Sequence, residues 1–201
     1  MLTYTEELNS HFKDLSLEIE AIRHTFSKIT EALPGSFRPF AIFFGKDSEK
    51  EFIITSRPVK DENDYYTAIS EMLFAYSSIK ATGVIFAIDA TKTSNSDTYD
   101  ALEIYAACDH FCTIYTLPYA VDSGKLIWSD HKFDTYTVDA LEKAYDTTGQ
   151  FHATLEIYEA LYLHTHMDDS VFDFSKLKDF YKRNDFEFVS IKQSESENNS
   201  D

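Results

Sequence analysis

A row of apolar residues near the start of the chain constrains the fold more than any other feature. An apolar side chain recurs at alternating steps of four and three, at Leu8, Phe12, Leu15, Ile19, Ile22, Phe26, Ile29 and Leu33. This spacing places all eight on one face of an α-helix. It predicts a long helix over residues 4–33, ended by Pro34 and Gly35.

This apolar face has two possible partners. Phe12 and Phe26 are bulky for the seam of a two-stranded coiled coil. We therefore expect the face to pack against the chain's own sheet, with self-association through the helix at 4–33 as the alternative.

Strand-like and helical segments follow in a regular order. Strands are expected at 40–44 and 51–55, 84–88, 101–108, 111–121 and 125–130, and helices at 61–79, 138–145, 151–163 and 174–183. Residues 91–97 are polar and are expected to form a loop. The pattern predicts an α+β fold: a mostly antiparallel sheet with a long N-terminal helix and a helical C-terminal third. We expect a single domain over 1–193 and a disordered acidic tail over 194–201.

The charge of the chain limits its partners. Thirty-five acidic residues face 18 basic ones, which gives a net charge of -17. This charge disfavours direct binding to nucleic acid or to an anionic membrane. It is compatible with a basic protein partner or with simple solubility. The candidate partner-binding residues are Asp168, Asp169 and Asp173, which lie where acidic residues are dense. The chain shows no secretory signal and no apolar run long enough to cross a bilayer, so we expect a cytoplasmic protein.

The segment 161-LYLHTHMDDSVFD-173 holds the candidate metal ligands His164, His166 and Asp168. They end a helical pattern, and on a helix the two histidines point roughly 200° apart. We therefore expect the histidines to favour the negative end of the helix and an aspartate to cap the next one. No cofactor and no stoichiometric zinc are expected.

A second possible metal site is 108-CDHFC-112, where two cysteines flank His110. The second pair of ligands that a zinc site needs is missing from the sequence. If the segment is one strand, Cys108 and Cys112 share a face. We expect two buried thiols on that face and no metal.

The chain resembles the JAB/MPN metalloproteases in two places. His164-Thr165-His166 followed by Ser170 and Asp173 is similar to the family's His-x-His-Pro and Ser-x-x-Asp motifs, with Met167 in place of the proline. The order of elements is also similar: a helix ending at Pro34, a strand pair in 40–59, a helix, 83-GVIFAID-89 and 94-SNSD-97.

The resemblance in element order implies a JAB/MPN-like core fold and the positions at which the family's site residues would fall. On that alignment, the family's metal-binding histidines would fall near Ala87 and Asp89, and Ser96 and Asp97 would be remnants of the site. The resemblance implies a catalytically inactive scaffold.

Other motifs for chemistry are absent from the sequence, and no catalytic residue is assigned. Asp89 is the most plausible acid for a cleft because it follows an apolar strand, although capping of a loop is the favoured interpretation. We predict a non-enzymatic, acidic protein-binding or regulatory protein, with a basic or nucleic-acid-binding partner. The alternative is a metal-dependent hydrolase of degenerate JAB/MPN type.

Overall fold

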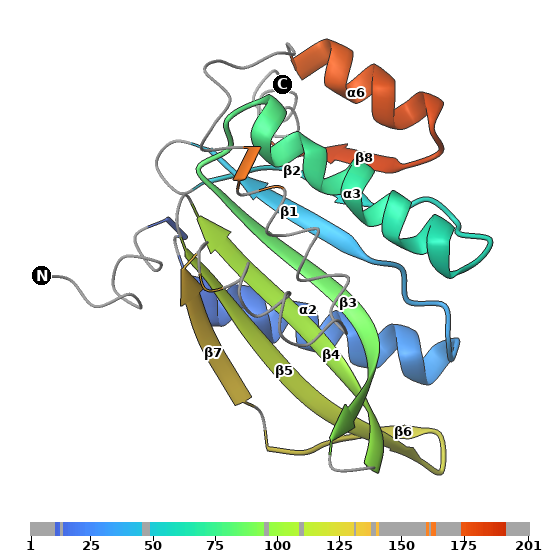
Figure 1. Cartoon of the computed structure of the whole chain (residues 1–201). Coiled ribbons are helices and arrows are strands. Elements are labelled where there is room, and N and C mark those ends of the chain that lie inside the picture. Colours follow the sequence, from blue (N-terminus) through green and yellow to red (C-terminus); the bar gives the residue numbers. More distant parts are fainter. Residues whose placement is uncertain are drawn as a thin grey trace, which may run out of the picture.

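A computed structural model describes residues 11, 12, 14–45, 49–94, 97–108, 111–130, 132–137, 140, 160, 162, 163 and 174–191. Within these residues the fold is α+β, with one antiparallel sheet and helices on both of its faces (Figure 1). The elements are α2 (Leu15–Ala32), β1 (Phe40–Phe44), β2 (Lys50–Thr55), α3 (Glu62–Ser78), β3 (Gly83–Ser94), β4 (Asp97–Cys108), β5 (Phe111–Asp122), β6 (Lys125–Trp128), β7 (Lys132–Thr137), α6 (Phe174–Arg183) and β8 (Glu187–Ser190). None of the described helices has the length and apolar character needed to cross a membrane.

Among the described residues the sheet has eight strands, in the order β6-β5-β4-β3-β1-β2-β8, and β7 pairs with the first half of β5. Strands β3 to β6 form an antiparallel meander, in agreement with the mostly antiparallel sheet that the sequence predicts. Strand β8 comes from the far end of the chain and pairs with β2. The sequence analysis did not predict β7 or β8.

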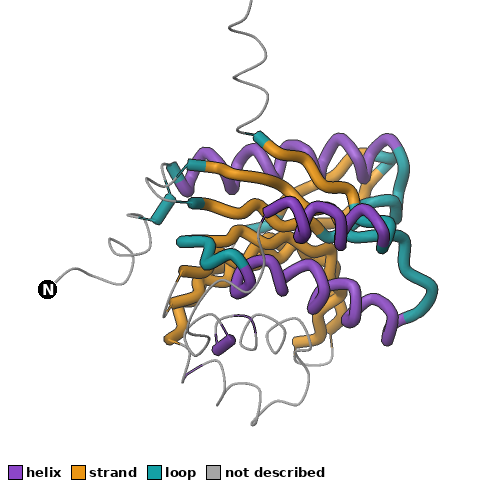
Figure 2. The backbone as a smooth tube through the Cα atoms, turned by 90° about the horizontal axis from the view of Figure 1, so that it is seen from above, coloured by secondary structure: helices purple, strands orange, loops and turns teal. Residues whose placement is uncertain are grey.

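The sheet separates two apolar cores. Viewed along the sheet, α2 lies on one side, and α3 and α6 lie on the other (Figure 2). Strand β1 supplies both cores in alternation: Ala41 and Phe43 face α3, while Ile42 and Phe44 face α2. All four are 5% exposed or less, so this strand is buried on both faces.

Helix α2 confirms part of the predicted N-terminal helix. Asp14 caps its start, since its carboxylate accepts a hydrogen bond of 3.1 Å from the backbone N–H of Leu17. Leu15, Ile22 and Phe26 are at most 4% exposed, as the apolar spacing predicts. Leu33 was expected on the same face but is 66% exposed. It is the C-cap residue, and its backbone is not helical (φ -144, ψ 80), so it has left the helical spacing. Residues 1–10 lie outside the described residues.

Helices α3 and α6 are joined by one buried tyrosine. Asp61 caps α3, because its carboxylate accepts a hydrogen bond from the N–H of Asp64 at 2.9 Å. Tyr181 of α6 donates its phenolic O–H to the backbone carbonyl of Glu71 at 2.6 Å and lies 3.1 Å from the N–H of Ala75. Its side chain is fully buried, so this contact fixes α6 against α3. Helix α6 has the predicted bounds, whereas the predicted helices at 138–145 and 151–163 fall almost wholly outside the described residues.

The predicted polar loop at 91–97 is wrong. Strands β3 and β4 continue to Ser94 and Asp97, which pair with each other at the end of a long hairpin. Thr91 and Thr93 are β-branched and suit a strand. The outer part of the hairpin is largely exposed, so its polar side chains stay in contact with water and folding carries no desolvation cost for them.

Substitutions at Phe26 and Leu33 test the assignment of the α2 face. Phe26→Ala is expected to lower the free energy of unfolding by about 3–5 kcal/mol, because it empties a fully buried site beside Phe37, Tyr119 and Trp128. Leu33→Ala is expected to change it by less than about 0.5 kcal/mol. Urea unfolding of the two variants measures both effects. Equal decreases in the free energy of unfolding for the two variants would show that Leu33 also packs on the sheet.

Candidate functional site

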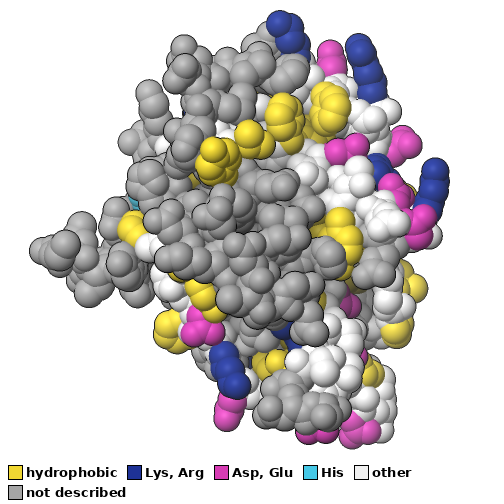
Figure 3. Space-filling model, in the orientation of Figure 1, with side chains coloured by type: hydrophobic (Ala, Val, Ile, Leu, Met, Phe, Trp, Pro, Cys, Tyr) yellow, Lys and Arg dark blue, Asp and Glu magenta, His cyan; other side chains and the backbone are white. Residues whose placement is uncertain are grey.

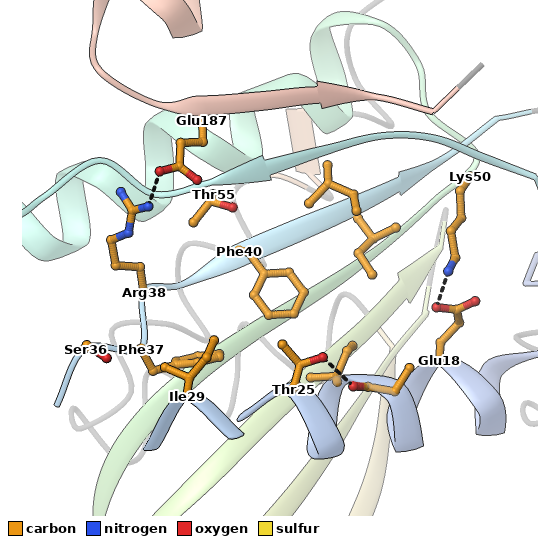
Figure 4. A pocket seen from close by; sticks show the side chains of 14 residues that line it. Glu18, Thr25, Ile29, Ser36, Phe37, Arg38, Phe40, Lys50, Thr55 and Glu187 are labelled. Atoms are coloured by element: carbon orange, nitrogen blue, oxygen red, sulfur yellow. Dashed lines mark hydrogen bonds and ion pairs between the residues drawn. The ribbon is translucent and has the colours of Figure 1, made fainter. Parts of the chain in front are cut away.

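A groove of about 450 Å³ lies between α2 and strands β1, β2 and β8 (Figure 4). Its apolar lining comes from Ile22 and Ile29 of α2, Phe37 before β1, Phe40 and Ile42 of β1, and Ile53 of β2. Ile22 and Ile42 are buried, while the other four are half-buried and present carbon surface to the groove. The groove is therefore an apolar surface of a size that suits a ligand or a few side chains of a partner.

Two ion pairs stand at the ends of this groove. At one end the Nζ of Lys50 lies 2.6 Å from Oε2 of Glu18, which joins β2 to α2. At the other end the guanidinium of Arg38 contacts the carboxylate of Glu187, which joins the segment before β1 to β8. Figure 4 shows the two pairs with Phe40 between them. The charges are thus held at the ends and leave an apolar centre.

Strand alternation explains how the sequence builds this site. Residues 40 and 42 of β1 and 53 and 55 of β2 point to the α2 side, because every second residue of a strand faces the same way. Among the strands, helix α2 has most contacts with β4 and β6. The groove is a part of this face, beside α2, that stays open.

Asp89 occupies the same face of the sheet, at a different place. It lies within β3, since that strand continues to Ser94, so it does not cap a loop as the sequence analysis favoured. Tyr119 donates a hydrogen bond of 2.7 Å to its Oδ1. Burial raises the pKa of the Asp89 carboxyl, and the hydrogen bond from Tyr119 opposes this shift only partly. The nearby charge of Asp100 raises the pKa further.

Glu103 is a buried carboxylate on the opposite face of the sheet. It is 3% exposed and lies 2.6 Å from the Nζ of Lys92. Tyr105 donates a hydrogen bond of 2.8 Å to its other oxygen. Leu102, the cross-strand partner of Asp89, faces α2, so its neighbour Glu103 points away from Asp89. The two acids therefore do not form a catalytic pair.

The two cysteines do not share a face, which corrects the sequence expectation. Strand β4 ends at Cys108 and β5 begins at Phe111, so the segment is a hairpin end and not one strand. Cys108 packs in the α2 core and Cys112 in the α3 core. Burial raises the pKa of the Cys112 thiol above its usual value. His110 lies outside the described residues.

The predicted metal ligands His164, His166 and Asp168 and the predicted partner-binding residues Asp168, Asp169 and Asp173 also lie outside the described residues. Within the described ranges, no three His, Cys, Asp or Glu residues are grouped closely enough to hold a metal ion.

The positions implied by the JAB/MPN resemblance are spread along β3 and β4. Ala87 and Asp89 both face the α2 side, and Ala87 is fully buried beside Phe40. Asp97 pairs with Ser94, five residues beyond Asp89 on β3, which corresponds to roughly 17 Å of strand. The structure does not bring Asp97 to Ala87 and Asp89, and Ser96 lies outside the described residues.

Several described acidic residues outside Asp168, Asp169 and Asp173 have contacts within the fold. Arg57 lies 2.6 Å from Asp64, and its hydrogen bond lowers the pKa of that carboxyl to about 2. Asp61 caps α3, and Glu187 is paired with Arg38. Asp179 lies on α6 together with the basic residues Lys176, Lys178, Lys182 and Arg183. Figure 3 shows dark blue basic side chains over this helix, among magenta acidic ones.

Searches of family models, curated proteins and solved structures gave no match to this chain. The groove is therefore interpreted from its own geometry and chemistry.

The sequence analysis missed the groove. It assigned Ile22 and Ile29 to one apolar stripe and 40–44 to a buried strand, which is correct for each element. Strand β8 was not predicted, and the exposed surface over β2 and β8 exists only after this C-terminal strand has paired with β2.

Asp89→Asn tests whether Asp89 opposes folding at neutral pH. The pKa of Asp89 is higher in the folded state than in the unfolded state. The contribution of Asp89 to the free energy of unfolding is therefore fully present below the unfolded pKa of 3.8 and is lost as pH rises through the folded-state pKa. Asp89→Asn is therefore expected to raise the free energy of unfolding at pH 7 and to leave it nearly unchanged below pH 3.8. Urea unfolding at both pH values measures this, with the exposed Asp130→Asn as a control of small effect. Destabilisation by Asp89→Asn at pH 7 would contradict the assignment.

Proposed function

We propose that the chain is a non-enzymatic, acidic regulatory protein that binds another protein, and that the groove beside α2 is the contact surface. The observation that carries the proposal is the open apolar centre of the groove between its two ion pairs. Half-buried Phe37, Phe40 and Ile53 gain most when a partner removes their remaining surface from water. Their central position is typical of the residues that supply most of the energy of a protein interface.

The charge of the chain supports a basic partner. With a net charge of -17, the long-range field attracts cationic surfaces and speeds their encounter. The ion pairs at the groove ends add specificity, since a partner must match the positions of Glu18, Lys50, Arg38 and Glu187. We place the protein in the cytoplasm, a reducing compartment in which two thiols outside any disulfide are common.

The alternative proposal is a metal-dependent hydrolase of degenerate JAB/MPN type. It is supported by the order α2, β1, β2, α3 and β3, which follows the element order of that family as the sequence analysis described it. On this proposal the purified protein holds a stoichiometric divalent metal ion, which metal analysis measures, whereas the binding protein holds none.

Thr25→Trp tests the groove as the contact surface. Thr25 is an exposed residue of α2 that lines the groove, so an indole there fills the space that a partner needs. The immobilised wild-type protein is expected to capture a specific protein from a lysate of the native host and to release it between about 0.05 and 0.5 M salt. The Thr25→Trp variant is expected to retain less than a tenth of that protein, measured by quantitative mass spectrometry.

The control is His24→Trp, which adds the same side chain to the neighbouring exposed position outside the groove lining. It is expected to capture as much as the wild type. Equal capture by all three proteins would place the contact surface elsewhere, and binding that does not respond to salt would reject the basic partner.

A further inference from the structure

The two faces of the sheet have unequal helical cover among the described residues. Helices α3 and α6 pack on one face, and α2 alone packs on the other (Figures 1 and 2). Beside α2, strands β1, β2 and β8 form a strip that spans two inter-strand spacings, or about 10 Å. This width equals the distance at which two packed helices lie side by side, about 8–10 Å. The strip therefore has room for one further helix.

The wall of the groove has the character of a helix-packing surface. Glu18, Ala21, Thr25 and Ile29 line it at steps of three and four, so they form one row along α2. Ala21 and Thr25 are small and allow another backbone to approach closely. From residue 18 to residue 29 the row is about 16 Å long, which corresponds to three helical turns.

The floor of the groove continues to the edge of the sheet. Ile53 of β2 faces the α2 side, and its cross-strand partner Val189 of β8 faces the same way. Val189 is 56% exposed. With Phe40 and Ile42 on β1, these side chains form an apolar floor three strands wide.

The chemistry of this surface selects a helix over an extended peptide. A strand lying on the face of a sheet finds no backbone partners there, so its N–H and C=O groups would be buried without hydrogen bonds. Peptide strands bind at sheet edges for this reason. A helix satisfies its own backbone and buries only side chains. The polar side of that helix faces solvent, and the long-range field of a chain with net charge -17 favours Lys and Arg there.

We infer that the groove binds a basic amphipathic helix of about three turns from a partner protein. The helix lies along α2 and completes a two-helix layer over β1, β2 and β8. Its apolar side chains, spaced three and four apart, contact Phe40, Ile53 and Thr25. This inference rests on the proposed function and specifies the element that the partner supplies.

The test uses three synthetic peptides of 14 residues with a fluorescent label. The first has Leu and Ala on one helical face and Lys on the other, the second replaces Lys by Glu, and the third scrambles the first. The Lys peptide is expected to bind the full-length protein and to gain helical circular dichroism. The Glu and scrambled peptides are expected to bind at least tenfold more weakly. Thr25→Trp is expected to weaken binding of the Lys peptide at least tenfold, and His24→Trp less than twofold.

Four outcomes would overturn the inference. Equal binding of the Lys and scrambled peptides would show attraction by charge alone, and equal binding by wild type and Thr25→Trp would place the peptide outside the groove. A wild-type dimer that Thr25→Trp converts to a monomer in light scattering would make a second copy the occupant. Peptide binding that appears only after deletion of residues 1–10 would make this chain's own N-terminal segment the occupant.

The same variants separate this inference from the proposed function. If Thr25→Trp abolishes capture of the native partner while no helical peptide binds, the groove is the contact surface but its ligand is not a helix. If the Lys peptide binds in the groove and the native partner does not depend on Thr25, the helix site exists and the proposed function is wrong.

Discussion

Strand β1 sends Phe43 toward α3 and Phe44 toward α2, and neither side chain is more than 1% exposed. Neither face of such a strand can be left in water. The phenylalanine on the exposed face would lose the free energy that burial of a large apolar side chain contributes. Both faces of the central sheet must therefore be covered. This requirement explains why α2 crosses one face and α3 crosses the other.

The groove is a consequence of how this cover is distributed. A single helix is about 10 Å wide and covers about two or three strands, whereas the sheet has eight in the described residues. Helix α2 lies toward β4 and β6, where Phe26 contacts Tyr119 and Trp128. The strands on its other flank keep part of their apolar surface in contact with solvent. Ion pairs as exposed as Arg38–Glu187 contribute little to stability, so we regard the pairs at the groove ends as elements of specificity.

The acidity of the chain is partly used within the fold. Asp14 and Asp61 cap helices, Asp64 pairs with Arg57, and Glu103 forms a buried pair with Lys92. These contacts neutralise acids locally without removing the net charge of -17. A protein with this charge attracts basic partners at long range, while the affinity at short range depends on apolar contact. In the proposed function, the groove supplies that contact.

The sequence by itself determined the elements whose signal is local. A continuous apolar run and the turn residues after it defined β1 and β2, Asp61 and the apolar spacing defined α3, and α6 was predicted with its observed bounds. The α+β class followed from these. Tertiary structure alone decided the pairing of β8 with β2, the extension of β3 beyond Asp89, and the placement of Cys108 and Cys112 on opposite faces. It also decided the groove, whose lining comes from positions as far apart as Glu18 and Glu187. Caps, turns and periodicity act over a few residues, whereas strand order and the cover of a sheet depend on contacts between segments that the sequence separates by more than a hundred residues.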